Sequence, residues 1–142
     1  MKDVIIKEQI FNHSIDKVWK AISIGEEIST WFINADFKPE PGYKYTFTAG
    51  EEKGCTQITG VVKEANPYTL IYTWMVENTD VETTVKWILE EVEGKTKLVL
   101  EHSGISNYTA DTAVTMFGHF SAGWDNCVKL LKEYLTKEVH AG

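Results

Sequence analysis

The segment covering residues 83–104 constrains the fold more than any other part of this sequence, because it predicts a long β-hairpin. Apolar residues alternate with polar ones in both arms, and the two apolar faces consist of Val85, Trp87 and Leu89 in the first arm and Leu98, Leu100 and His102 in the second. The tripeptide Glu93-Gly94-Lys95 between the arms predicts the turn. One face of the hairpin is therefore apolar, and another element of the fold has to cover it.

The stretch from about Asp111 to Lys137 predicts one long amphipathic helix that can cover this face. Its apolar residues recur at helical spacing: Ala113, Met116, Phe117, Phe120, Trp124, Cys127, Leu131, Tyr134 and Leu135. At 1.5 Å per residue such a helix is roughly 40 Å long, which exceeds the length of the strands it would cross. The pattern therefore predicts a curved antiparallel sheet wrapped around a single helix.

Gly118 and Gly123 lie inside this predicted helix, where each costs about 1 kcal/mol relative to alanine. The favoured interpretation is that they allow close packing of the helix against the sheet, since glycine lets backbones approach each other. The alternative is that they leave room for a ligand beside Phe120 and Trp124.

The rest of the chain completes an α+β pattern. Residues 3–11 alternate as a strand, Ser14 stands at the N-cap of a short helix, and Ile28, Trp31 and Phe32 mark a second short helix. Further strands are predicted at 43–48, 55–65 and 68–77, before the hairpin. The expected order is one strand, two short helices, about six strands and the long helix, giving a sheet of six to seven strands.

Composition limits the functions open to this chain. A length of 142 residues with 43% apolar content fits a single domain spanning 1–142. The net charge of −7 argues against nucleic acid or an anionic membrane as a partner. No N-terminal apolar run is long enough for a signal peptide or membrane span, so we expect a cytoplasmic protein in which Cys55 and Cys127 are reduced, buried thiols.

The residues that carry catalysis or bind metals in other proteins form no recognisable motif here. His13, His102, His119 and His140 are far apart, and the sequence contains no H-E-x-x-H, C-x-x-C or G-x-S-x-G. We therefore expect no catalytic residues, no bound metal and no cofactor. A metal site built from Cys55, Cys127 and a histidine is a minor alternative.

Several short segments in a fixed order carry a family resemblance across essentially the whole chain. They include S-I-D-K-V-W-K-A-I at 14–22, W-F at 31–32, G-V-V-K-E at 60–64, L-I-Y-T-W at 70–74, T-T-V at 83–85, K-T-K-L at 95–98, E-H-S-G at 101–104 and G-W at 123–124. With these, the chain resembles the homologues of the C-terminal domain of the activator of the ninety-kilodalton heat-shock-protein ATPase, within the START-like (SRPBCC) superfamily. The resemblance implies a helix-grip fold. Pro41-Gly42-Tyr43 departs from the Gly-Gly pair that the family often carries in this turn.

The resemblance implies a cavity between sheet and helix, which related proteins use for lipids, sterols, flavonoid-like molecules or polyketides. The leading hypothesis is non-enzymatic binding of a small hydrophobic or aromatic ligand, with a stress-related role as one option. A second hypothesis is a co-chaperone-like interaction module with a chaperone as partner. Because the first strand begins by about residue 3, we expect the activator's separate N-terminal domain to be missing and the chain alone not to stimulate the chaperone. A cyclase-like enzyme using the same cavity is a third hypothesis.

The candidate ligand site consists of the inward aromatics at the middle of the sheet and of the helix, with one polar residue. These are Trp74, Trp87, Phe117, Phe120, Trp124 and His102. For His102 the favoured interpretation is a histidine satisfied by a buried hydroxyl or backbone group, and the alternative is a polar contact to the ligand. A plain aromatic core, with no cavity, is the competing interpretation of the whole group.

Overall fold

The computed structural model of the chain describes residues 4–49, 56–77 and 79–141, so the predicted turn at 51–54 and the predictions about Cys55 fall outside the described residues. Seven described strands form one antiparallel sheet in the order β1-β7-β6-β5-β4-β3-β2. Their bounds are β1 Ile5–Phe11, β2 Asn34–Asp36, β3 Lys44–Ala49, β4 Thr56–Asn66, β5 Thr69–Val76, β6 Thr83–Val92 and β7 Lys95–Ser103.

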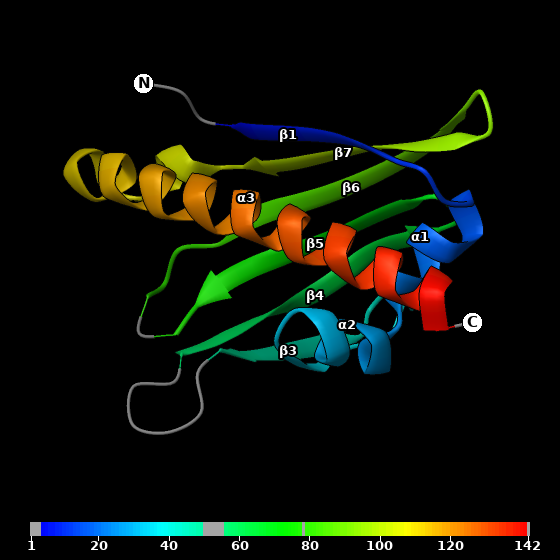
Figure 1. The fold of residues 1–142 in the computed structure, drawn as a ribbon. Helices are drawn as coiled ribbons and strands as arrows, with labels where there is room; N and C mark the ends of the chain where they lie inside the picture. Colours follow the sequence, from blue (N-terminus) through cyan, green and yellow to red (C-terminus); the bar gives the residue numbers. More distant parts are fainter. Residues whose placement is uncertain (1–3, 50–55, 78, 142) are drawn as a thin grey trace.

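Two short helices, a 3-10 turn and one long helix complete the described fold. They are α1 Ile15–Ser23, α2 Gly25–Trp31, η1 Ile105–Asn107 and α3 Ala110–Ala141. Helix α3 runs along one face of the sheet, and α1 and α2 lie beside its C-terminal half (Figure 1). The predicted helix-grip architecture is confirmed, and α3 continues through both of its glycines.

Local sequence signals account for the main boundaries. The Ser14 hydroxyl accepts a hydrogen bond from the Lys17 backbone N–H at 3.3 Å and so caps α1 as predicted. In the hairpin, Glu93 and Gly94 both have positive φ, 50° and 80°, as a tight two-residue turn requires. The arms then pair Trp87 with Leu100, which keeps the two apolar faces on one side of the sheet.

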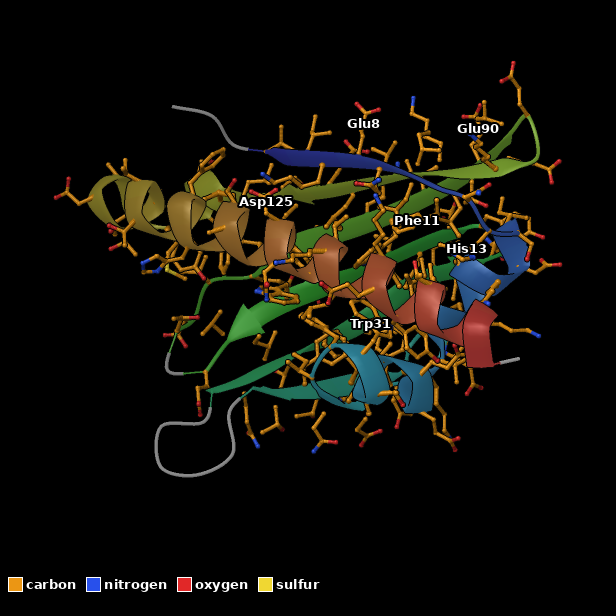
Figure 2. The ribbon with its side chains drawn as sticks, viewed as in Figure 1. Glu8, Phe11, His13, Trp31, Glu90 and Asp125 are labelled. Carbon is orange, nitrogen blue, oxygen red and sulfur yellow. The ribbon has the colours of Figure 1, made fainter. Side chains whose placement is uncertain are left out.

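The core fills the space between the sheet and the helices. Phe11 and Trp31 point into this space, whereas Glu8 and Glu90 point outward (Figure 2). The Trp31 indole N–H donates to the Ala21 carbonyl at 2.8 Å, which fixes α2 against α1.

Helix α3 is attached to its neighbours on two sides. Lys7 of β1 donates a hydrogen bond to the Ser121 hydroxyl at 2.9 Å and forms an ion pair with Asp125 at 3.0 Å. Further along the helix, the Tyr134 hydroxyl donates to the Glu27 carboxylate of α2 at 3.0 Å. These contacts set the position of α3 over the sheet.

A glycine in β4 shapes the sheet where the candidate site lies. The register between β4 and β5 shifts between Val62 and Glu64. A Cβ on Gly60 would lie only 2.0 Å from the Thr73 carbonyl oxygen, so this close approach requires glycine. The Thr73 hydroxyl in turn accepts from the Val61 N–H at 2.8 Å. Thr73 and the adjacent Trp74, which lie before the register shift in the regularly paired part of the ladder, are both buried.

The structure differs from the sequence-based expectations in two respects. Strand β2 and the η1 turn were not predicted, because elements of three residues are too short to show periodicity. The favoured interpretation of Gly118 and Gly123 is wrong, since a Cβ on either would meet no atom within 4 Å. Both glycines are exposed, because large aromatic side chains occupy the face of α3 that meets the sheet.

Candidate ligand-binding pocket

Aromatic side chains from β5, β6, β7 and α3 meet at the centre of the molecule. Trp124 of α3 lies 5.1 Å from Trp74 and 5.9 Å from Trp87, measured between ring centroids. Phe120 stacks on His102 at 4.6 Å and meets Trp74 edge-on at 6.3 Å. The structure thus brings together five of the six predicted site residues, which we call the central cluster: Trp74, Trp87, His102, Phe120 and Trp124. The sixth, Phe117, is half-buried on α3.

Hydrogen bonds occupy both ring nitrogens of His102. The Trp124 indole N–H donates to Nδ1 at 2.9 Å, and Nε2 lies 2.7 Å from the Thr83 hydroxyl. Because an indole nitrogen only donates, Nδ1 must be the acceptor and Nε2 must carry the proton. The Thr83 hydroxyl in turn donates a hydrogen bond to the Trp74 carbonyl at 3.2 Å. His102 therefore links the sheet to helix α3 through the Trp124 indole. Its other nitrogen is satisfied by the buried Thr83 hydroxyl, as in the favoured interpretation of this residue.

Burial keeps the titratable groups near the cluster uncharged. Desolvation lowers the pKa of His102 to about 3, so the imidazole is neutral at physiological pH. Burial also raises the pKa of the Cys127 thiol, which is free and buried, and that of the Tyr72 hydroxyl. A neutral imidazole and protonated thiol suit packing better than proton transfer or nucleophilic attack. Among the described residues, no three His, Cys, Asp or Glu side chains are grouped to hold a metal ion.

A pocket of about 210 Å³ opens beside the central cluster, between α3 and the sheet. Three cluster residues line it, Trp74, Phe120 and Trp124. Trp87, His102 and Phe117 are not among its lining residues. The remaining wall consists of Phe32, Ile33, Ile58, His119, Gly123 and Asn126, of which only Gly123 had been connected with a ligand from the sequence, as an alternative.

The mouth of the pocket lies on one stripe of α3. His119, Gly123 and Asn126 are exposed and stand at i, i+4 and i+7, so they share one side of the helix. Gly123 has no side chain to close the gap between its two polar neighbours. In the sequence, only Gly123 indicated this mouth. The alternative interpretation of that glycine was that it leaves room for a ligand beside Phe120 and Trp124.

Three of the four buried indole N–H groups have hydrogen-bond acceptors. Trp31 donates to a backbone carbonyl, Trp87 to the Tyr72 hydroxyl at 3.0 Å and Trp124 to His102. Trp74 differs, because its buried Nε1 has no hydrogen-bond partner among the described residues. This nitrogen belongs to a residue that lines the pocket.

The sequence pattern of the family described as "Activator of Hsp90 ATPase homolog 1-like protein" matches residues 12–136, which is most of the chain. The chain belongs to this family. Membership in the Activator of Hsp90 ATPase homolog 1-like family agrees with the resemblance that the sequence segments carry, and with the helix-grip fold. A comparison with curated protein sequences gives no match.

Solved structures with this fold include several bacterial proteins. Protein MLL2253 from Mesorhizobium loti superposes with a TM-score of 0.83 at 24% identity, covering 94% of this chain and 97% of that one. Protein BH1534 from Bacillus halodurans gives a TM-score of 0.74 at 27% identity, with 94% and 96% covered. DynU16, described as a putative protein in the dynemicin biosynthetic locus, gives 0.81 at 20% identity, and 96% of this chain spans only 48% of that one.

The described helices include none that combines the length and the apolarity needed to cross a membrane. Family membership and fold are together consistent with ligand binding between sheet and helix, with the class of ligand left open.

Proposed function

We propose that this chain binds a small apolar or aromatic molecule, without chemical conversion, in the pocket between α3 and the sheet. The observation that carries the proposal is the open space at Gly123 next to a wall made largely of aromatic and aliphatic side chains. Pockets of this composition, with few polar groups, are typical of small-molecule sites. The neutral state of His102 and Cys127 supports binding over catalysis.

The volume of the pocket indicates the size of the molecule that it can enclose. About 210 Å³ lies below the 300 to 1,000 Å³ usual for drug-sized ligands, but above the roughly 150 Å³ cavity that accepts benzene. A one- or two-ring molecule fits these limits. A larger lipid-, flavonoid- or polyketide-like molecule would bury one ring and leave the rest outside, between His119 and Asn126.

The two glycines of α3 give a matched pair of variants. Each has open space around a Cβ, but only Gly123 lines the pocket. We expect Gly123→Leu to weaken the binding of indane, a two-ring hydrocarbon, at least about tenfold, because the added side chain occupies the mouth. Gly118→Leu should leave that binding within about twofold of the parent protein. Both variants should be at least as stable as the parent, since leucine favours helix more than glycine does.

Isothermal titration calorimetry with indane measures the binding, and thermal unfolding measures the stability. Equal loss of indane binding in both variants would point to a site elsewhere on α3. Failure of indane and of larger aromatic probes to bind the parent protein would overturn the proposal.

Family membership favours a second candidate function, interaction with an Hsp90-type chaperone. A steady-state ATPase assay with the chaperone tests it directly. Stimulation at stoichiometric amounts of this protein, unaffected by Gly123→Leu, would make chaperone interaction the primary function and assign it to a surface other than the pocket.

A further inference from the structure

The unpaired N–H of Trp74 sets a requirement on the ligand. Trp74 is only 5% exposed, and its buried Nε1 has no acceptor in the part of the chain that the structure describes, while the other three buried tryptophans are paired. Buried donors are nearly always satisfied in native proteins, so an exception in the wall of a pocket needs an explanation. A bound molecule with an acceptor atom supplies one.

We propose that the ligand is an aromatic or polycyclic molecule carrying a hydrogen-bond acceptor, such as a ring ketone, and that this atom accepts from Trp74 Nε1. The inference rests on the proposed function and specifies the chemistry of the ligand. The apolar body of the ligand packs against the aromatic and aliphatic wall, and its acceptor pairs with Trp74 Nε1, the buried donor that the described part of this wall leaves unpaired. Molecules that lack the acceptor leave the N–H unsatisfied and bind less well.

Other polar groups of the central cluster are already engaged, which leaves Trp74 as the anchor. Both nitrogens of His102 are bonded, and the indole N–H groups of Trp87 and Trp124 have acceptors. An acceptor on the ligand that competed for any of these would have to break an existing bond. Trp74 offers its N–H without that penalty.

Reaching the N–H requires a small movement of the wall, because the nitrogen is buried. Phe120 is the residue placed to move. Its ring is half-buried, meets Trp74 edge-on and lines the same pocket. Side-chain rotamer changes of this kind are common when ligands bind, and they need no change of the backbone.

The test compares indane with 1-indanone, which has the same bicyclic skeleton and adds one ketone oxygen. The dissociation constants of both are measured for the parent protein, for Trp74→Phe and for Trp87→Phe. The control is matched, since Trp87 is also a buried tryptophan in contact with Trp124 but does not line the pocket. The ratio of the indane constant to the indanone constant should fall about two- to tenfold in Trp74→Phe, the range expected for one net hydrogen bond. It should stay unchanged in Trp87→Phe.

A second measurement needs only the parent protein and covers the case in which Trp74→Phe does not fold. In a proton–nitrogen correlation spectrum of the parent, with indole signals assigned by selective labelling and ring contacts, the Trp74 N–H should move downfield with 1-indanone and not with indane. If both probes bind but neither the ratio nor this signal responds to the ketone, the acceptor proposal is overturned and the pocket stands. If neither probe binds, the acceptor proposal and the proposed function both fail.

Discussion

At the scale of single residues, His102 of β7 contacts both the neighbouring strand β6 and the helix α3. It accepts from Trp124 on the helix, donates to Thr83 on the sheet and stacks against Phe120. The bond from Trp124 requires the neutral ring, because protonated Nδ1 could no longer accept from the indole. The protonation state of one buried side chain therefore bears on how the helix is held.

We expect acid to destabilise the protein through this histidine. The pKa of His102 is about 3 in the folded state against about 6.5 in the unfolded state, so the unfolded state binds more protons between these values. Stability contributed by the neutral ring is complete above pH 6.5 and is lost as the pH falls toward 3, by at most about 1.4 kcal/mol per pH unit. Urea unfolding at several pH values measures this slope.

The control for the pH effect is His102→Gln, which removes the titrating ring and keeps a polar side chain. The free energy of unfolding of this variant should be lower at pH 7 and should change less between pH 6.5 and 4 than that of the parent protein. A pH dependence identical in the two proteins would assign the acid sensitivity to the surface carboxylates instead.

At the scale of secondary-structure elements, β4 approaches β5 unusually closely at Gly60, next to Trp74. Gly60 lies in the regularly paired part of the ladder, before the register shift between Val62 and Glu64, and Thr73, which it approaches, directly precedes Trp74. Trp74 follows Leu70 and Tyr72 on the inward face of β5, as strand alternation requires, and Thr73 is buried where β4 approaches closely.

Gly60→Ala should therefore destabilise the protein strongly. The added methyl group would meet the Thr73 backbone at 2.0 Å, and a backbone cannot turn aside as a side chain can. We expect a loss of about 1 to 3 kcal/mol, as for other overpacked sites. The matched comparison is Gly118→Ala, which has free space and should gain up to about 1 kcal/mol in helix propensity. Urea unfolding measures the stability of both variants. Equal stabilities of Gly60→Ala and Gly118→Ala would contradict the role assigned to Gly60.

The periodic elements could be predicted from the sequence, and the irregular ones could not. Alternation in both hairpin arms and the long stripe of α3 correctly indicated which faces are buried, because burial itself imposes the two periods. The register shift between Val62 and Glu64 and the short strand β2 carry no period. The open glycines of α3 were misjudged because the same residue serves close packing and empty space equally well.

At the scale of the whole molecule, the pocket is the part of the gap between the two layers that aromatic side chains leave unfilled. Phe120 lines this gap, so Phe120→Trp should fill it. We expect indane binding to fall at least about tenfold while the free energy of unfolding changes by less than about 1 kcal/mol. Phe117→Trp is the matched control on the same helix, since Phe117 does not line the pocket and its replacement should leave binding intact.

Calorimetric titration with indane and urea unfolding of these two variants show whether this region is a pocket or a close-packed core. A loss of about 1 to 3 kcal/mol of stability in Phe120→Trp, with binding retained, would mean that the enlarged ring is overpacked and that indane sits elsewhere.

Three of the nine residues that line the pocket were predicted as site residues from the sequence, and Gly123 was predicted only under its alternative interpretation. Parity and helical spacing place Trp74, Phe120 and Trp124 on inward faces, which is all that a one-dimensional pattern can give. Phe32, Ile33 and Ile58 come from segments whose distance from α3 depends on the whole chain path. His119 and Asn126 are exposed, and nothing in their spacing separates them from other solvated residues of the helix.

The attachments of α3 and the mouth of the pocket lie on different residues of that helix. Ser121, Trp124, Asp125 and Tyr134 hold it in place, whereas His119, Gly123 and Asn126 face solvent. Substitutions at the three mouth positions can therefore accumulate without loosening the fold. A lineage with this architecture can change what it recognises through one stripe of one helix, so relatives that share the scaffold need not share a ligand.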